Sequence, residues 1–404
     1  MVKNSFLLIF IFLFSCTKKD VFDAKKQFII NPIAKCENGF AGEYPCNDYD
    51  LLTHISLEDM SGENTTGSDC WGWVNPLTDN EYALMCTNKG VTFVDITDPA
   101  NAVILGTLKT RTVDNPIREI KVHNSIAYIV SEADDHQMQL FNLRRLEGVI
   151  NPPEEFTADK IYNSFKTAHN ITINEDSGYA YVVGSDTYNG GPHFVDLNKN
   201  FKPIEAGGYA DNSYSNDIQV VTYNGPDTEY SGKEILIGSN QTEVVIVDVT
   251  DKENPKKITS FSYPNISYTH KGWFTEDQRY FIVGDEFDER DFGMNTKTIV
   301  FDFSDLNNPI HHVDYFGLSI AIDHNGYVKG NLLYQANYTG GIRMIDISDI
   351  ENKNLSEVGY FDTYPENDNA SFNGTQNVYP YLPSGNIIVS DISRGLFVIR
   401  KKGS

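Results

Sequence analysis

The sequence predicts an all-β fold, a seven-bladed β-propeller whose ring is closed by an N-terminal strand in the last blade. The first observation is a pair of apolar strands that recurs seven times along the 404 residues. The second is the content of 23 Tyr and 24 Phe, residues that suit half-buried pleated surfaces. We therefore expect one repetitive domain rather than the two or three ordinary domains that the length alone would suggest.

Each repeat contains an apolar strand, a short polar break, and a second apolar strand that often ends in Asp before a turn. The second strands close at positions 95, 142, 196, 248, 302, 346 and 399, which lie 44 to 54 residues apart. This spacing is typical of one four-stranded propeller blade. The closing Asp residues and their polar neighbours are expected to stabilise turns. The seven units are Ala83–Asp95, Ala127–Asn142, Ala180–Asp196, Ile235–Asp248, Phe281–Asp302, Leu333–Asp346 and Ile387–Ile399.

An outer strand is expected after most of these units. The second blade shows no clear outer strand between Arg144 and Asp159, and none follows the seventh unit. Leu51–Leu57 has a suitable pattern, so we expect it to complete the last blade and remove an open sheet edge. The recognised outer strands are Ala102–Lys109, Lys202–Gly208, Lys256–Tyr263, Ile310–Phe316 and Leu355–Asp362.

The N-terminal residues predict export and lipid anchoring. Lys3 precedes an apolar run, Phe6–Phe14, which has the length of a signal-peptide core and is too short to span a bilayer. The run ends at Leu13-Phe14-Ser15-Cys16, which resembles a bacterial lipobox, so Cys16 is the expected lipidation site. We therefore expect a signal peptide at 1–16, a tether at 17–35 and the propeller at 36–404, on a lipoprotein of the cell surface or outer membrane.

The remaining four cysteines suggest two disulfides in an oxidising compartment. If Asn75 pairs with Glu81 across the first hairpin, Cys70 lies directly opposite Cys86. Cys36 and Cys46 would then form the second bridge. The alternative is that Cys70 and Cys86 remain reduced as small core residues.

Charge and missing motifs exclude several functions. The net charge of −24 opposes binding to nucleic-acid phosphates, so no nucleic-acid partner is expected. The sequence contains no Gly-x-Ser-x-Gly elbow, His-Glu-x-x-His helix, phosphate-binding loop or dinucleotide fingerprint. These absences argue against several large enzyme classes, though not against all catalysis.

Polar residues recur where each innermost strand begins, which should be one rim of the central channel. The aligned positions are Cys70, Arg118, His169, Asn216, His270, His324 and Gln376. The second strands of the blades end at the same rim, at Asn88, Glu132, Asp186, Asn240, Asp285, Asn337 and Asp391. The residues predicted to bind a ligand there are Arg118, His169, Asn216, His270, His324, Asp186 and Asp285.

A divalent metal is the cofactor that this rim suggests. His169, His270 and His324 with neighbouring carboxylates could hold Zn²⁺, or they could orient an anionic or sugar ligand. The alternative is that each imidazole bonds a neighbouring group and fills the rim. The acidic stretch 285–291 could bind Ca²⁺ or be a solvated loop. The three tryptophans, Trp71, Trp73 and Trp273, are expected to pack in the core, with stacking on a sugar as the alternative.

Several short stretches resemble the choice-of-anchor B family, which is built from LVIVD-type repeats. The resemblance runs from about Cys36 to Arg400 and implies a surface propeller without an established reaction. The matching stretches are Asp69–Trp73, Ser131–Ala133, Ala168–Ile171, Val247–Lys252, Tyr268–Trp273, Gly284–Glu286, Ile322–Asn325 and Arg394–Phe397.

The expected function is that of a lipid-anchored binding or scaffold protein. One propeller face would bind a protein, glycan or small molecule, and the N-terminal lipid would bind the membrane. The alternative is a metal-dependent hydrolase or lyase that uses the histidine-bearing rim, and a purely structural spacer is the third possibility.

Overall fold

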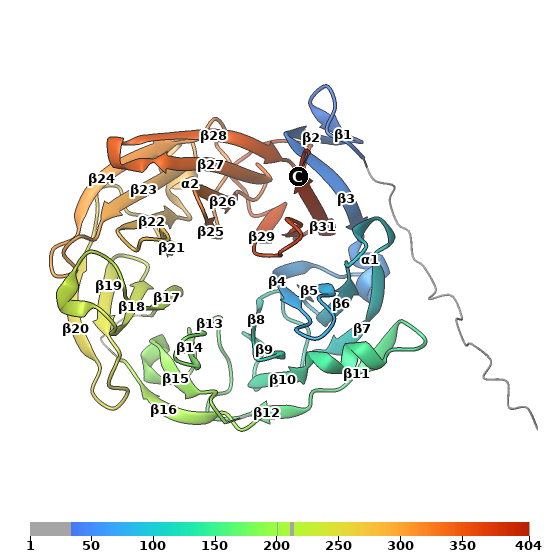
Figure 1. The fold of residues 1–404 in the computed structure, drawn as a ribbon, viewed down its shortest axis with the longest axis horizontal. Helices are drawn as coiled ribbons and strands as arrows, with labels where there is room; N and C mark the ends of the chain where they lie inside the picture. The colour runs from blue at the N-terminus through green and yellow to red at the C-terminus, as the bar shows by residue number, and fades with distance from the viewer. Residues whose placement is uncertain (1–33, 200, 211–213, 404) are drawn as a thin grey trace, which may run out of the picture.

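The structure, a computed structural model, describes residues 34–199, 201–210 and 214–403, which form seven sheets arranged as a ring (Figure 1). The predicted all-β propeller of seven blades is confirmed. Within the described residues, no helix is long and apolar enough to cross a membrane. The expected signal peptide, the lipidation site Cys16 and most of the tether lie outside the described residues.

The first three blades follow the expected strand order, with the innermost strand first. The first blade contains β4 (Gly67–Val74), β5 (Glu81–Thr87), β6 (Gly90–Asp95) and β7 (Val103–Lys109). The second contains β8 (Arg118–His123), β9 (Ile126–Ser131), β10 (Met138–Asn142) and β12 (Lys160–Tyr162). The third contains β13 (Asn170–Asn174), β14 (Tyr179–Val183), β15 (His193–Asp196) and β16 (Ile204–Gly208).

The remaining four blades repeat this order. The fourth contains β17 (Asp217–Thr222), β18 (Glu234–Ser239), β19 (Val244–Asp248) and β20 (Lys256–Phe261). The fifth contains β21 (Thr269–Phe274), β22 (Tyr280–Asp285), β23 (Lys297–Asp302) and β24 (Ile310–Phe316). The sixth contains β25 (Gly326–Lys329), β26 (Leu332–Ala336), β27 (Ile342–Asp349) and β28 (Asn354–Phe361). The seventh contains β29 (Thr375–Tyr379), β30 (Ile387–Asp391), β31 (Gly395–Lys401) and β3 (Tyr49–Ile55).

Helices are short and lie in the connections. The α-helices are α1 (Leu57–Ser61) and α2 (Asp288–Phe292). The 3₁₀ turns are η1 (Pro99–Asn101), η2 (Leu143–Gly148), η3 (Tyr188–Gly190), η4 (Thr228–Tyr230) and η5 (Ile350–Asn352).

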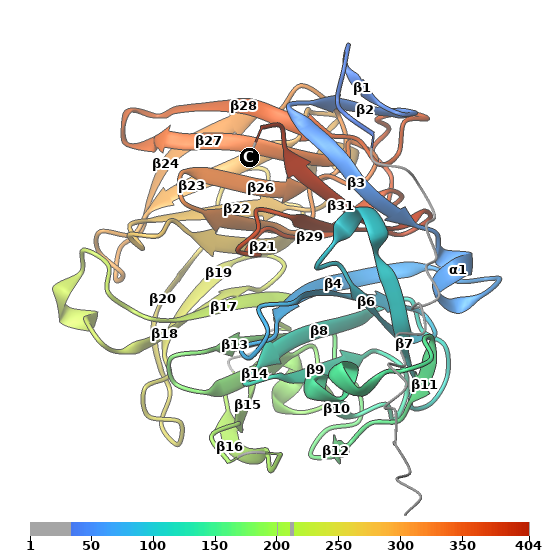
Figure 2. The same cartoon turned by 45° about the vertical axis from the view of Figure 1, so that its right-hand side comes forward.

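The N-terminal segment adds strands to two neighbouring blades. β3 pairs antiparallel with β31, with Leu51 opposite Ile399, and Figure 2 shows the two strands side by side. The strand ends before the expected Leu57, because Leu57 begins α1. The preceding hairpin of β1 (Phe40–Ala41) and β2 (Tyr44–Asn47) pairs with β28 of the sixth blade.

The outer strand of the second blade differs from those of the other blades, which is why the sequence pattern did not predict it. Its outer strand is β12, only three residues long, and it follows a detour of the chain. In that detour β11 (Glu154–Phe156) returns to the first blade and pairs parallel with β7. The stretch therefore serves two sheets, and no single apolar strand stands out in it.

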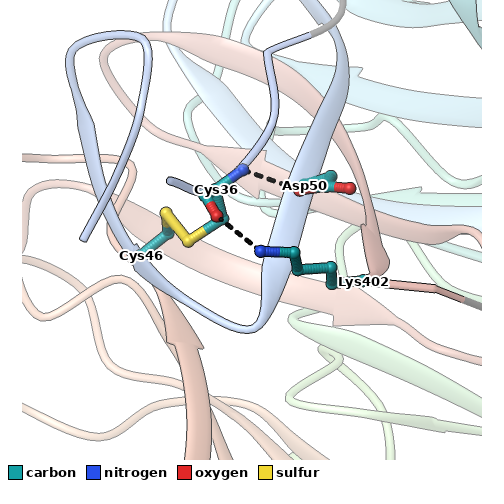
Figure 3. Close-up of a disulfide and its surroundings, with 4 residues drawn as sticks. All are labelled: Cys36, Cys46, Asp50 and Lys402. Atoms are coloured by element: carbon teal, nitrogen blue, oxygen red, sulfur yellow. Dashed lines mark hydrogen bonds between the residues drawn. A yellow bond between two sulfur atoms is a disulfide. The ribbon is translucent and has the colours of Figure 1, made fainter. Parts of the chain in front are cut away.

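The expected Cys36–Cys46 disulfide is confirmed, and it fixes the hairpin that precedes β3 (Figure 3). The backbone N–H of Cys36 donates to Oδ1 of Asp50 over 2.6 Å. Nζ of Lys402 donates to the carbonyl oxygen of Cys36 over 3.3 Å. The bridge therefore connects β2 with the segment that contacts both β3 and the C-terminal residues.

The expected Cys70–Cys86 disulfide is wrong, because both cysteines are free and buried. Cys70 stands opposite Met85, one residue away from the expected register. Side chains alternate between the two faces of a strand, so a shift of one residue places the two thiols on opposite faces. Accordingly, Cys70 and Cys86 belong to two different hydrophobic clusters.

Candidate metal centre

One end of the innermost strands carries most of the polar residues that the sequence placed at the rim. Arg118 is the first residue of β8, and Asn216 directly precedes β17. His169 directly precedes β13, His270 is the second residue of β21, and His324 lies two residues before β25. Figure 1 shows the innermost strands around the centre of the ring. Each of these residues lies at or near the start of its innermost strand, so they belong to one rim.

Three side chains converge at this rim, namely His270, Glu286 and His324. One potential ligand atom from each lies within 4.8 Å of the others. Nε2 of His270 is 3.9 Å from Oε2 of Glu286, and Nε2 of His324 is 3.7 Å from Oε1 of the same carboxyl group. The two imidazole rings are 4.4 Å apart between centroids. Among the described residues, this is the one group of three ligating side chains close enough to share an ion.

The three side chains are shielded from solvent. Their exposed fractions are 6% for His270, 10% for Glu286 and 9% for His324. The site is built from two neighbouring blades, because Glu286 follows β22 of the fifth blade and His324 precedes β25 of the sixth. A cluster held between two rigid sheets is pre-organised for binding.

Neighbouring groups orient the cluster. Nδ1 of His324 lies 2.6 Å from the carbonyl oxygen of Gln376, which can only accept, so this nitrogen carries the proton. Nε2 of His324 is then left with its lone pair, on the side that faces Glu286. The hydroxyl of Tyr338 donates to Oε1 of Glu286 over 2.9 Å. Carbonyl and hydroxyl partners of this kind commonly fix the ligands of metal sites.

One ring nitrogen of the cluster has no partner. Nδ1 of His270 is buried, and no hydrogen bond joins it to another described residue. Nearly all buried polar atoms in proteins are satisfied, but other buried side-chain atoms of the described residues, such as Oδ1 of Asp323 and Oε1 of Gln376, also lack a partner. Nδ1 is not the nitrogen that faces Glu286, because Nε2 of His270 is the atom that approaches this carboxyl group, so a shared ion would bind at Nε2.

The electrostatics of the cluster suit a cation. Burial lowers the pKa of His324 to about 4 and lowers the pKa of His270 well below its usual value. Both imidazoles are therefore neutral at pH 7, as metal ligation requires. Burial also raises the pKa of Glu286 to about 7, although the hydrogen bond from Tyr338 opposes this shift. A positive charge beside this buried carboxyl group would stabilise its ionised form.

His169 stands beside this cluster and is not a member of it. Its Nδ1 lies 2.7 Å from Oε1 of Glu132, and its side chain is partly exposed. It is close enough to lower the pKa values of His270 and His324 further, through charge repulsion when protonated. The structure thus brings together two of the three histidines proposed as ligands, and Glu286 stands where a third histidine was expected.

Two other residues proposed for the rim have structural partners. Arg118 is fully buried, and its guanidinium donates to the carbonyl oxygen of Thr87 and the hydroxyl of Thr110. The carboxylate of Asp285 accepts hydrogen bonds from the Tyr263 hydroxyl and from backbone N–H groups.

Asp186 and Asn216, the remaining residues predicted to bind a ligand at the rim, differ in their exposure to solvent. Asp186 is exposed and accepts a hydrogen bond from the N–H of Lys166. Asn216 is buried, and its Oδ1 accepts from the hydroxyl of Tyr268. Its Nδ2 has no partner among the described residues. Of these two, Asn216 therefore retains an atom that a ligand could use.

The acidic stretch 285–291 supplies Glu286 but forms no calcium loop. Asp288 begins α2, and its carboxylate forms an ion pair of 2.9 Å with Lys297. The Glu289 side chain accepts from the N–H of Lys297, and burial raises its pKa to about 11. Two of the acidic side chains are thus buried against β23, where they face one lysine instead of solvent.

Sequence reasoning missed Glu286 because it aligned the neighbouring Asp285 with the ends of the other second strands. The available signal was the pair Asp285-Glu286 itself, in which adjacent residues point to opposite sides. The carboxylate of Asp285 accepts hydrogen bonds from backbone N–H groups of the loop that precedes β21. The carboxyl group of Glu286 faces His270 and His324 instead.

Comparisons with known proteins identify the fold and not the family. No family model matches the chain, and no curated protein matches it either. A structure of hydrazine synthase from Kuenenia stuttgartiensis is similar, with a TM-score of 0.57 and 14% identity over 80% of this chain and 93% of that one. A protein from Lactobacillus plantarum has a TM-score of 0.53 and 9% identity over 80% of this chain and 87% of that one. At these identities the similarity shows the propeller fold alone.

Proposed function

We propose that this protein is a binding propeller that holds a divalent transition-metal ion at His270, Glu286 and His324. The observation that carries the proposal is the convergence of three ligand atoms within 4.8 Å of one another in a shielded site. The orientation of His324 supports it, because the hydrogen bond of its Nδ1 to the carbonyl oxygen of Gln376 leaves Nε2 facing Glu286.

The ligand types favour zinc over calcium. Imidazole suits Zn²⁺ and the other late first-row metals, whereas Ca²⁺ takes oxygen ligands. Around a tetrahedral ion with bonds of about 2.0–2.1 Å, neighbouring ligand atoms lie about 3.3 Å apart. The separations from the two Glu286 oxygens are 3.9 and 3.7 Å, and all three ligand atoms lie within 4.8 Å of one another, so the side chains must move closer together by up to about 1.5 Å to bind an ion.

The test is zinc binding by the purified, metal-stripped protein, measured by calorimetry and by metal analysis. We expect one zinc ion per chain. His324→Ala and Glu286→Gln should each weaken binding by about 100-fold or more, since each removes one of three ligands. The control is His311→Ala, which changes an exposed histidine on β24 that pairs with Asp314. Equal zinc affinity in the wild type and the ligand variants would disprove the metal centre.

A second candidate function is that of a metal-dependent hydrolase or lyase. It is favoured by the presence of three protein ligands instead of four. Catalytic zinc sites have three protein ligands and keep one position open for water, whereas structural sites have four. The test is zinc-dependent turnover of activated ester and phosphoester substrates, with Glu286→Gln as the inactive variant. If the zinc-loaded protein is no faster than free zinc ions, this candidate is rejected for those substrate classes.

We also propose that the protein is exported and anchored by a lipid on Cys16, on the basis of the apolar run Phe6–Phe14 and the lipobox-like stretch Leu13-Phe14-Ser15-Cys16. The Cys36–Cys46 disulfide supports an oxidising compartment. Cys16→Ser should move the protein from the membrane fraction to the soluble fraction of the producing cell. Unchanged membrane association of that variant would reject the lipid anchor.

A further inference from the structure

The opposite end of the channel holds a second candidate site. A cavity of about 480 Å³ opens there, a volume typical of small-molecule sites. Its lining includes Val122, Thr222 and Tyr379, which lie near the ends of β8, β17 and β29, whereas His270 lies near the start of β21. The cavity therefore includes the end of the innermost strands away from His270, and it extends along the channel to Asp217 and Lys271, near the starts of β17 and β21.

One wall of the cavity is aromatic. Trp71 on β4 lies 4.8 Å from Tyr379 between ring centroids, and Tyr379 lies 5.5 Å from Tyr381. Trp273 on β21 lies 4.9 Å from Tyr327 on β25. Edge contacts of Tyr327 with Trp71 and Tyr381 join the two groups into one surface. Four blades thus present a continuous aromatic surface to the cavity.

The facing wall, formed by β13 and β17, carries hydroxyl and amide groups. Thr172 on β13 and Gln219 on β17 line it. Oε1 of Gln219 accepts from the N–H of Phe274 over 2.8 Å, and its amide nitrogen has no partner among the described residues. No hydrogen bond to another described residue involves the Thr172 hydroxyl. These groups are available to a ligand.

The charged residues of the cavity are already paired. Nζ of Lys271 lies 2.8 Å from Oδ2 of Asp217 and 4.4 Å from the ring centre of Tyr327. Nζ of Lys121 lies 3.0 Å from Oδ2 of Asp69 and 4.5 Å from the ring centre of Trp71. The lysine charges are therefore balanced by carboxylates, and both ammonium groups already lie over aromatic rings.

These features disfavour three classes of ligand. A cation would meet two ammonium groups over the aromatic wall. An anion would meet the carboxylates of Glu175 and Asp176, which line the cavity, while Lys271 and Lys121 are already paired with Asp217 and Asp69. A flat apolar molecule would cover the polar wall and leave its donors and acceptors unpaired, which is costly.

We propose that this cavity binds a neutral sugar ring. A pyranose has an apolar face of C–H groups that can stack on the aromatic wall, and hydroxyl groups on its edge that can bond Thr172 and Gln219. Tyrosine and tryptophan suit such a ligand, because their rings are large and apolar and carry a polar group at one edge.

The test uses tryptophan fluorescence together with ligand-observed NMR on the full chain. The probes are glucose, galactose, N-acetylglucosamine, maltose and cellobiose, with indole and benzoate as competing chemical classes. The chain has 3 Trp residues, and two of them, Trp71 and Trp273, line the cavity. Trp73→Phe is the matched control, because Trp73 is buried against Tyr82 and does not line the cavity.

At least one saccharide should bind saturably to the wild type and equally well to Trp73→Phe. Trp71→Leu, which removes a stacking ring, and Thr172→Val, which removes a hydroxyl at nearly constant volume, should each weaken binding about tenfold. Thermal unfolding checks that each variant remains folded. The proposal is overturned if no saccharide binds, if Trp71→Leu and Thr172→Val both bind as the wild type does, or if indole or benzoate binds while the saccharides do not.

Discussion

Arg118 and His136 form a buried pair in which Nη1 of the guanidinium lies 2.7 Å from Nε2 of the imidazole. Both residues have no solvent exposure. Arginine is always a donor, so Nε2 of His136 must be the acceptor and the imidazole must be neutral. Nδ1 of His136 then donates to the carbonyl oxygen of Gln137 over 2.8 Å. This pair ties the start of β8 to the loop that precedes β10.

The pair makes stability dependent on pH. Burial lowers the pKa of His136 to about 4, and the charge of Arg118 contributes to this shift. The unfolded chain takes up a proton at this residue near pH 6.5, whereas the folded chain does not. Stability is therefore unaffected by His136 above pH 6.5, falls between about 6.5 and 4, and is reduced by about 3 kcal/mol below that. His136→Gln should remove this part of the acid-induced loss.

The measurement is the free energy of unfolding in denaturant at several pH values, for the wild type and for His136→Gln. Glutamine can still accept from Arg118, so the two proteins should differ mainly in their slopes below pH 6.5. Parallel curves over the whole range would show that His136 does not contribute.

Closure of the ring by β3 should appear in the stability of the whole domain. Ile55 is 1% exposed and belongs to the cluster that contains Leu396 and Val398 of β31. Ile55→Ala should lower the free energy of unfolding by about 2–5 kcal/mol, because it leaves a cavity between the first and last blades. Leu77→Ala is the control, since Leu77 is 70% exposed in a hairpin loop and should change stability by less than about 0.5 kcal/mol. Similar stability of the two variants would contradict a role for β3 in holding the ring together.

Repetition made the fold predictable from the sequence. Each blade repeats the same apolar pairs, so an error in one strand leaves the count of blades unchanged. The expected unit Ile235–Asp248, for example, coincides with β18 and β19 to within one residue. The second blade was the exception, because β11 leaves that blade to pair with β7 of the first.

Registers within single hairpins were not predictable in the same way. The expected loop between β4 and β5 had five residues, 76–80, but Asn80 rejoins the ladder by accepting from the N–H of Asn75. Asp79 adopts a left-handed conformation, with φ of 57°, which allows a loop of four residues. The loop is one residue shorter than expected, so the register of β4 and β5 shifts by one residue and Cys70 faces Met85 instead of Cys86. His270 and His324 were placed at the rim by comparison between blades, so the same error did not affect them.

His169 provides a test of which residues form the metal centre. Its imidazole pairs with Glu132 and lies outside the group of His270, Glu286 and His324. His169→Ala should therefore retain zinc affinity within a few fold of the wild type, whereas His270→Ala should lose it. Calorimetric titration of both variants with zinc measures the difference. Loss of zinc binding in His169→Ala would favour the centre of three histidines that the sequence suggested.

Cys70 and Cys86 should remain thiols even in an oxidising compartment. Cys70 lies opposite Met85, so the two sulfur atoms lie on different faces of the sheet and cannot be bridged without breaking the strand register. Both side chains are fully buried, and burial raises the pKa of each thiol well above its usual value. Alkylation of the folded protein should therefore be slow at both positions.

After unfolding without a reductant, mass spectrometry should find label on Cys70 and Cys86 and none on Cys36 and Cys46. In Cys70→Ala the number of labelled sites among these two positions should fall from two to one. If the two cysteines formed a disulfide, the same change would raise it from none to one, because Cys86 would be freed. Absence of label on both Cys70 and Cys86 in the unreduced wild type would show that they are joined, and the register between β4 and β5 would then have to be the one in which they face each other.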